Sequence, residues 1–480
     1  MQSDPTPTGD VERARRPLTV GKTRVDRLDD VDPRLTRLVT AYLACATFWL
    51  VLGTLVGLFL GFALMWPDLS EVSWLSFGRL RPVHTNTVFW GWSSLGMLGL
   101  AHYVVAKTSR ARLHSYKLGW VALALINLCV IAGDALLIAG VNNAGQEYRE
   151  YIWPVMALFG AALVLVAVNF YRTIRARQTR EIYISNWWIL AAVLWTLTLA
   201  VIAYLPGYQE GLGQTLIQGY YMHQGVGMWF TPMVLGLTYY FLPRLLDTPI
   251  YSYSLGALAF GTQLLFYTMI GSHHFVFSPI PWWLQTVAII FSIGMIIPVV
   301  AGTANFALTA RGHWGAIRKS YALPFIAVGV FYYMVGSLQG SIEALRTANL
   351  YWHFTNFTVG HSHLTMYGFV AFLIWGGVYG LLPRLTGREP AQLAVGMHFW
   401  LAFVGLAIYG VSMSVGGTAQ GVSWLAGDPF MESVRAMAPY WVWRAVGGTL
   451  MFTSHLIFAY NLWTMTPLSE ASAAEEVSGD

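Results

Sequence analysis

Long apolar segments recur along almost the whole chain, and they restrict its fold more than any other feature. A helix that crosses a bilayer needs about 20 apolar residues, and segments of this length alternate here with short polar stretches. Charged residues make up 11% of the 480 residues, against about 25% in soluble domains. The sequence therefore predicts an all-α, polytopic protein in a lipid bilayer and argues against a water-soluble globule.

The apolar segments predict about twelve transmembrane helices joined by short loops. They lie approximately at 38–66, 84–107, 118–140, 153–175, 187–206, 214–244, 254–275, 283–310, 320–345, 355–386, 393–417 and 440–465. We expect three parts: a polar N-terminal tail at 1–36 without the apolar core of a signal peptide, a transmembrane domain at 37–466 and an acidic C-terminal tail at 467–480.

Loop charges predict the orientation of these helices. If the N-terminus lies in the cytoplasm, the inner loops include the basic stretches KTSRARLHSYK (107–117) and TARGHWGAIRK (309–319), whereas outer loops such as NNAGQEYRE (142–150) are more acidic. Cytoplasmic loops are enriched in Lys and Arg, so both termini are predicted to be cytoplasmic. The net charge of +5 is spread over these loops, which argues against a nucleic-acid partner.

The two cysteines carry no recognisable chemistry. Cys45 and Cys129 lie inside apolar segments and form no Cys-x-x-Cys pattern. Neither a disulfide framework nor a thiolate metal site is therefore predicted.

Most of the 12 histidines fall within or beside predicted spans, where ionisable side chains are costly and usually functional. The exceptions, His114 and His313, lie in basic inner loops and are expected to be solvated. With each span oriented, six histidines fall at a similar depth in the outer part of the membrane: His84, His223, His273, His274, His361 and His363. Neutral imidazole binds iron and copper well, so this group predicts metal ligands on facing helices.

Spacing refines this prediction. Positions i and i+2 of a helix point about 200° apart, so His361 and His363 can bind different metals on opposite sides of one helix. The adjacent His273 and His274 can converge on one metal only where the helix is distorted or ends, which Gly271 allows.

At this point the chain resembles the heme-copper oxygen reductases, and within them the C family of cytochrome cbb3-type oxidases. The resemblance extends from about residue 38 to 465. It rests on motifs that include RPVHTN (81–86), YMHQGVG (221–227), YTMIGSHH (267–274), HFTNFTVGHSH (353–363) and WRAVGG (443–448).

The resemblance implies a metal centre of two hemes and one copper ion. His84 and His363 would be axial ligands of a low-spin heme and His361 the proximal ligand of a high-spin heme. A copper ion facing that heme would be held by His223, His273 and His274. No Cys-x-x-Cys-His motif occurs, so the hemes are expected to be non-covalent. The resemblance implies that they are of b type.

Further residues follow from the same resemblance. Tyr267 matches a redox-active tyrosine that the family joins to a copper-ligand histidine, and Arg444 would pair with heme propionates. His353 and His398 are either groups near those propionates or polar residues satisfied within the core. Glu147 and Glu150 match an acidic outer segment that is associated with calcium in the family.

One position departs from the family pattern. Gln339 occupies the place where the family usually has a glutamate behind the high-spin heme, which would change the hydrogen bonding of the proximal ligand. Glu343, one turn further along, is a possible substitute.

The function implied by the resemblance is that of the catalytic subunit of a terminal oxidase in a prokaryotic inner membrane. O2 would be reduced to water with electrons from the outer side, delivered by cytochrome c-type partner subunits. Protons would come from the cytoplasm, with proton pumping. Tyr267, Thr268 and Tyr333 are candidate members of a proton path.

Three alternatives remain open. A nitric oxide reductase of the same superfamily commonly has a glutamate four residues after the first histidine ligand. Gly227 at that position, together with Tyr267, favours copper and O2, whereas HLTMYGF (363–369) and Gln339 keep this alternative open. A secondary transporter would explain the spans but not six histidines at one depth. A non-catalytic cytochrome b anchor would leave the pair His273 and His274 unexplained.

Overall fold

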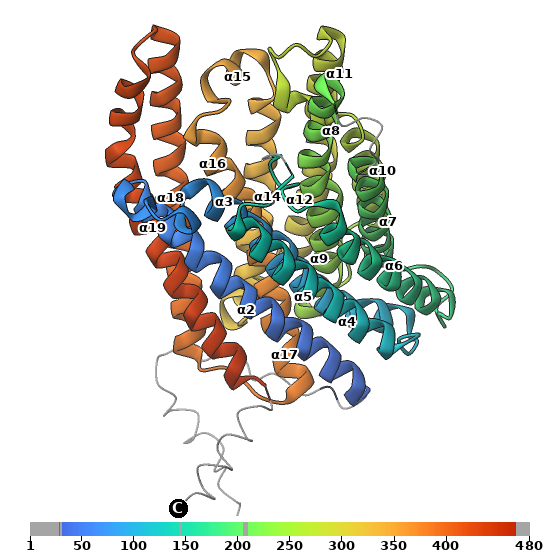
Figure 1. The fold of residues 1–480 in the computed structure, drawn as a ribbon. Coiled ribbons are helices and arrows are strands. Elements are labelled where there is room, and N and C mark those ends of the chain that lie inside the picture. The colour runs from blue at the N-terminus through green and yellow to red at the C-terminus, as the bar shows by residue number, and fades with distance from the viewer. Residues whose placement is uncertain (1–27, 29–30, 144–145, 205–209, 467–480) are drawn as a thin grey trace, which may run out of the picture.

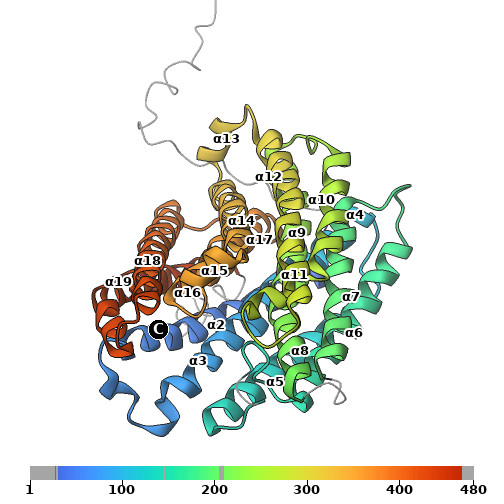
Figure 2. The ribbon, with the colours of Figure 1, turned by 90° about the horizontal axis from the view of Figure 1, so that it is seen from above.

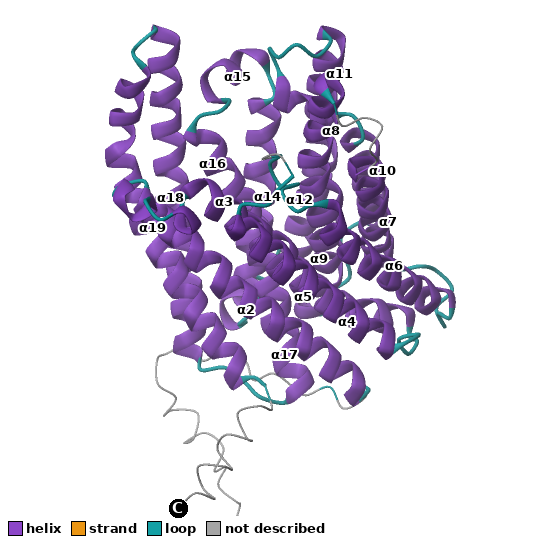
Figure 3. Ribbon diagram, viewed as in Figure 1, coloured by secondary structure: helices purple, strands orange, loops and turns teal. Residues whose placement is uncertain are grey.

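The computed structural model describes residues 28, 31–143, 146–204 and 210–466. Within these residues the chain consists of helices joined by loops, with no strand (Figure 3). The predicted C-terminal tail at 467–480 lies outside the described residues, as does nearly all of the N-terminal tail up to residue 30. The first helix begins at Pro33, a few residues before the predicted start of the membrane domain.

The described elements follow one another as an antiparallel bundle (Figure 1). They are α2 (Pro33–Ala63), η1 (Pro67–Ser70), η2 (Ser73–Leu75), α3 (Phe77–Asn86), η3 (Thr87–Ser93), α4 (Ser94–Ser109), α5 (Tyr116–Ala139), α6 (Trp153–Arg175), α7 (Ile184–Tyr204), α8 (Gly211–Gln224), η5 (Gly225–Phe230), α9 (Thr231–Leu246), α10 (Tyr253–Tyr267), η6 (Ile270–Phe275), α11 (Trp282–Gly294), α12 (Ile296–Ala310), α13 (Trp314–Lys319), α14 (Leu323–Glu343), α15 (Arg346–Trp352), α16 (Asn356–His363), η7 (Leu364–Ala371), α17 (Phe372–Thr386), α18 (Gln392–Ala426) and α19 (Phe430–Thr464).

Each of the twelve predicted spans falls on a helix or on a run of consecutive helices within the described residues. Eight helical stretches there are long and apolar enough to cross a membrane by length and composition alone. The spans at 84–107, 214–244, 254–275 and 440–465 are helical as well, although they fall outside that set. Seen from above, α18 and α19 form one edge of the bundle and α6 and α7 the other (Figure 2).

The last two helices are longer than predicted. Each contains 35 residues and is therefore about 52 Å long, whereas the hydrocarbon core is about 30 Å thick. Their joined ends reach the same end of the bundle as the tip of α11 (Figure 1), and there Trp424 Nε1 donates to Ser433 Oγ at 2.8 Å. Hydropathy marks only the part of a helix that the bilayer covers, so it missed this extension and also the short helix α15.

Two loops, one before α5 and one before α10, use the same capping arrangement. Ser115 caps α5 by accepting from the backbone of Leu118 at 3.3 Å, and its own backbone N–H donates to Asn169 Oδ1 at 2.9 Å. Ser252 caps α10 and donates its backbone N–H to Asn305 Oδ1 at 3.0 Å. A serine cap satisfies free N–H groups at a helix start, and the two asparagines fix these loops to α6 and α12 respectively.

In the part of the chain that the structure describes, three π-helical segments interrupt the helices: η3, η5 and η7. Each segment begins within three residues of a predicted ligand, after His84, His223 and His363 respectively. A π-helical turn widens the helix and is frequent at functional sites. The distortions therefore lie at the level of the histidines.

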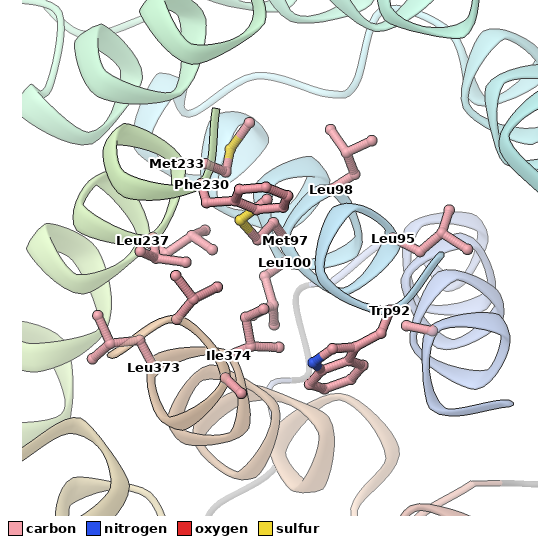
Figure 4. Close-up of a cluster of buried hydrophobic side chains, with 14 of the residues drawn as sticks. Trp92, Leu95, Met97, Leu98, Leu100, Phe230, Met233, Leu237, Leu373 and Ile374 are labelled. Atoms are coloured by element: carbon pink, nitrogen blue, oxygen red, sulfur yellow. The ribbon is translucent and has the colours of Figure 1, made fainter. Parts of the chain in front are cut away.

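Below the histidines the interior is filled by apolar side chains. The helix formed by α16, η7 and α17 is the most deeply buried of the apolar spans, and it packs against α4 and α9 (Figure 4). The cluster includes Trp92, Leu95, Met97, Leu98, Leu100, Phe230, Met233, Leu237, Leu373 and Ile374. This close-packed region supports the part of the bundle that contains the histidines, where a cavity lies.

Candidate metal centre

A cavity of about 900 Å³ opens among the central helices. All six histidines predicted as ligands line it, and they come from α3, α8, η6 and α16. Two more histidines, His353 and His455, share the lining. Sequence positions nearly 300 residues apart are thus brought into one site.

His223, His273 and His274 form a compact three-histidine cluster. One ring nitrogen from each lies within 4.8 Å of the others. Nδ1 of His223 is 2.8 Å from Nε2 of His274. Among the residues that the structure describes, this is the only such group of three or more candidate metal ligands. Its spacing suits a single ion bound by imidazole nitrogens.

His273 and His274 converge because they lie on the tight 3-10 turn η6. This is the helix distortion that the sequence analysis predicted for two adjacent ligands of one metal. The role of Gly271 differs from the expected one. A Cβ at this position would lie 2.6 Å from the Cα of Tyr220 and 2.7 Å from the carbonyl oxygen of Gly219. The glycine therefore permits close packing of η6 on α8, and no unusual backbone angle is involved.

Side chains orient two of the histidines on this side of the cavity. The Ser292 hydroxyl donates to a backbone carbonyl, so Nδ1–H of His273 donates to Ser292 Oγ at 2.7 Å. Nδ1–H of His361 donates to Gln339 Oε1 at 3.1 Å. Each bond leaves Nε2 free to bind a metal. Gln339, and not Glu343, is therefore the partner of His361, although Glu343 also lines the cavity.

Backbone carbonyls orient the two histidines on the other side. Nδ1 of His84 lies 2.7 Å from the Gly53 oxygen, and Nδ1 of His363 lies 2.8 Å from the Val359 oxygen. The two rings are within 13° of parallel and their centroids are 6.4 Å apart. Two metal–imidazole bonds of about 2 Å each account for most of this separation. His361 and His363 thus serve different sides of α16.

Tyr267 and Arg444 both reach the cavity. The Tyr267 ring stacks on His223 with centroids 5.2 Å apart. The Arg444 guanidinium lies 5.6 Å from the centroid of Tyr409, and the Tyr409 ring in turn lies 4.3 Å from that of His363. Both residues are therefore next to the predicted ligands.

Of the two additional histidines considered, only His353 lies near the cavity. It is in the loop between α15 and α16, where burial lowers its pKa to about 4, so its ring is neutral at physiological pH. His398 does not line the cavity, which argues against a place near propionates and favours the alternative of a packed core residue. It is six residues from the N-terminal end of α18 and bonds Tyr379 at 2.9 Å. The position of a residue along a long helix does not predict which side chains of other helices it contacts.

His455 was not identified from the sequence. Its Nε2 lies 3.1 Å from the Tyr367 hydroxyl, and its Nδ1 lies 3.0 Å from Thr54 Oγ1. A single histidine late in the last span carries no pattern that separates it from a packed polar residue.

The two outer glutamates are each connected to α3. Glu147 forms an ion pair with Arg81, and Glu150 accepts from Asn86 at 2.9 Å. Burial raises the pKa of Glu150 to about 7. The calcium site stays a prediction.

Comparison with known proteins assigns the chain to a family. Residues 37–450 match the family model described as cytochrome c and quinol oxidase polypeptide I. The chain belongs to this family. It is 32% identical over 453 residues to the cbb3-type cytochrome c oxidase subunit CcoN1 of Stutzerimonas stutzeri, which covers 89% of this chain and 94% of that protein. It is 33% identical over 452 residues to a cytochrome c oxidase subunit 1 homolog of Agrobacterium tumefaciens, covering 90% and 83%.

A solved heme-copper terminal oxidase dimer has the same fold. The TM-score is 0.76 at 17% identity, over 91% of this chain and 84% of the other. The oxidase family implies hemes and copper, and the cavity fits them. It offers one pair of facing, near-parallel imidazoles, a further imidazole oriented by Gln339, and a three-histidine cluster of the kind that copper accepts. The protein is therefore a multi-pass inner-membrane oxidase subunit.

Proposed function

We propose that this chain is the catalytic subunit of a terminal respiratory oxidase, which reduces O2 to water with electrons from the outer side and protons from the cytoplasm. The observation that carries this proposal is the three-histidine cluster with the Tyr267 ring stacked on it. Membership of the oxidase family supports it independently.

The residues divide into two sets of ligands. His84 and His363 would hold a low-spin heme, and His361 a high-spin heme, both of b type. His223 and its two neighbours on η6 would hold one copper ion. Arg444 would pair with heme propionates, because a guanidinium suits carboxylates.

When bound, the hemes and copper supply electron transfer and the binding of O2. The chain itself holds these groups in position and supplies protons. α16 carries ligands for both sides, so electrons need cross only the width of one helix. The Tyr267 hydroxyl can donate a proton and an electron beside His223. The neutral imidazoles keep their Nδ1–H bonds and therefore their orientation.

Protons must reach this outer site from the cytoplasmic side of the bundle. Tyr333 is buried, and with Tyr267 and Thr268 it is our candidate for the path. Each charge moved across the membrane stores about 2.3 kcal/mol per 100 mV, so this arrangement conserves energy, and we expect proton pumping in addition.

The surroundings complete the proposal. Both termini lie in the cytoplasm, as the basic inner loops suggest. Cytochrome c-type subunits deliver the electrons at the outer face. Glu147 and Glu150 bind calcium, an ion that prefers carboxylate oxygens; it would compete there with Arg81 and Asn86 for the two carboxylates.

The test is elemental analysis of the purified complex, with heme spectra and turnover on O2 and on NO. We expect about one copper per two hemes and rapid O2 consumption. Non-heme iron without copper, with preferential turnover of NO, would instead identify a nitric oxide reductase. Absence of heme would overturn both assignments.

A further inference from the structure

Positive charge is concentrated where the connection between α4 and α5 meets the connection between α6 and α7. The stretches 107–117 and 172–180 contain no Asp or Glu, but they contain eight of the 28 Lys and Arg residues of the chain. Seven of the eight are exposed and Arg177 is half-buried. We call this set the basic surface; its members are Lys107, Arg110, Arg112, Lys117, Arg172, Arg175, Arg177 and Arg180.

Two hydrogen bonds join the two stretches. The backbone N–H of His114 donates to Thr173 Oγ1 at 3.0 Å. The backbone N–H of Gln178 donates to the carbonyl oxygen of Ser109, also at 3.0 Å. The ends of α4 and α6 accordingly lie next to each other at the lower right of the bundle in Figure 1. The eight basic side chains therefore belong to one surface and not to two separate loops.

The protein does not neutralise this charge. Among the residues that the structure describes, none of the eight forms an ion pair. The Asp32 carboxylate accepts from Tyr116 in the same region, but it is already paired with Arg34 at 2.8 Å. The Nε atom of Arg177 is buried and has no hydrogen-bond partner in the described part of the chain. A buried donor without an acceptor is costly, so this group favours an acceptor from outside the chain.

The loop between α9 and α10 has the same framework without the charge. Arg110 and Asp247 end α4 and α9 in the same left-handed conformation, with φ of 48° and 49°. Ser115 and Ser252 then cap the next helices, and the backbone N–H before each serine donates to a threonine at 3.0 Å. The stretch 247–252 nevertheless contains no Lys or Arg. The fold of such a loop therefore does not require basic side chains.

Membrane orientation does not require this arrangement either. Lys and Arg in any cytoplasmic loop contribute to orientation, and other loops such as 309–319 also carry them. Exposed aromatic rings border the basic surface: Trp120 lies three residues after Lys117, and Tyr171 directly precedes Arg172. Exposed Trp and Tyr favour the level of the lipid headgroups. The basic side chains therefore lie within reach of headgroup phosphates.

We propose that the basic surface binds the phosphate groups of anionic phospholipids in the cytoplasmic leaflet. The half-buried Arg177 supplies a fixed donor, because a guanidinium matches the geometry of phosphate oxygens. The exposed Lys and Arg side chains around it attract the negative headgroup, as basic residues near an anionic leaflet do. Lipid binding here is independent of the reaction at the metal centre, although the choice of leaflet rests on the proposed orientation of the helices.

The experiment counts the lipids bound to the purified holoenzyme complex by native mass spectrometry. Phosphatidylglycerol and phosphatidylcholine with the same acyl chains are titrated separately. One variant combines Arg110→Gln, Arg112→Gln and Arg175→Gln. The matched control removes the same charge from exposed residues of other loops, with Arg244→Gln, Arg311→Gln and Lys319→Gln. The optical spectrum of the hemes reports whether each variant folds.

The wild type is expected to bind phosphatidylglycerol more tightly than phosphatidylcholine. The first triple variant should lose about tenfold or more in affinity for phosphatidylglycerol, because one hydrogen bond to a charged group is worth about this factor. The control should stay close to wild type. If the triple variant fails to fold, Arg110→Asp tests the same surface, since Asp247 shows that aspartate adopts this backbone conformation.

Three results would overturn the proposal. Equal loss of phosphatidylglycerol in both triple variants would mean that binding follows net charge alone. Equal affinity of the wild type for the two lipids would exclude recognition of the headgroup charge. Displacement of the bound lipid by inorganic phosphate at the same concentration would indicate a site for soluble anions instead.

Discussion

The two sides of α16 hold their histidines by different means. On the side of His84 and His363, both Nδ1 atoms meet backbone carbonyl oxygens. On the opposite side, His361 bonds a glutamine side chain and His273 a serine hydroxyl. The first arrangement does not depend on which side chains surround it. The second changes whenever one of two residues changes.

This difference matches the tasks that we propose for the two sides. A site that only passes electrons needs fixed ligands, which backbone acceptors supply. A site that performs chemistry gains from adjustable ligands, because outer hydrogen bonds tune the basicity of an imidazole and the potential of its metal. Substitutions that act on one side only are the means to test this interpretation.

The largest effect is expected at Gly57, which contacts His84 on the side of α16 where backbone carbonyls orient the histidines. A Cβ at Gly57 would lie 2.5 Å from Cε1 of His84. Gly57→Ala should therefore displace the ring and remove the low-spin heme, measured as loss of about one of the two hemes in the reduced-minus-oxidised spectrum. Gly61→Ala in the same helix meets nothing within 4 Å and should keep both hemes. Retention of a normal low-spin spectrum in Gly57→Ala would show that His84 does not hold this heme.

The second effect concerns the copper side. Ser292→Ala removes the acceptor of His273 Nδ1–H, and loss of such a partner typically lowers metal affinity 10- to 100-fold. Copper retention during dialysis against a chelator measures it. Ser341→Ala is the control, because that hydroxyl bonds the backbone oxygen of Ser292 at 2.9 Å and no histidine. Equal copper retention in both variants would contradict a role for the serine bond.

A smaller effect is expected at Gln339, where a substitution should change a heme potential without removing a metal. Gln339→Glu places a negative charge on the acceptor of His361, which increases the basicity of the ring and should lower the midpoint potential of the high-spin heme. Potentiometric titration with optical detection resolves the two hemes. Only the high-spin component should move, and a shift of the low-spin component alone would reverse the assignment of the two sides. Glu343→Gln, in the same cavity, serves as the control.

The smallest effect is expected at Asp32, which caps α2 and does not line the cavity. It serves as a reference for the effects at the histidines. Asp32 caps α2 by accepting from the Arg34 backbone at 2.9 Å, and Asp32→Ala should cost about 1 kcal/mol of stability. The hydrogen bond from the Arg34 side chain holds the pKa of Asp32 well below its usual 3.8. The carboxylate therefore stabilises the fold above that value and loses this contribution as the pH falls. Thermal unfolding should show a smaller difference between Asp32→Ala and wild type at a pH below 3.8 than at pH 7.

Much of the architecture follows from the sequence alone. The twelve spans and the common depth of six histidines were predictable, because bilayer thickness and residue hydropathy act locally along each helix. The opposed directions of His361 and His363 follow from helical geometry in the same way. Motif resemblance supplied the family, which the comparisons confirm.

The tertiary structure decided what depends on neighbours from distant segments. It placed Gln339, and not Glu343, at His361, put His398 beside Tyr379, and brought His455 to the cavity. It also showed why two positions are glycine: Gly271 packs closely against α8, and Gly227 packs closely against Tyr267. Each of these contacts joins residues at least 19 positions apart in the chain, and no local pattern encodes which side chains will meet across packed helices.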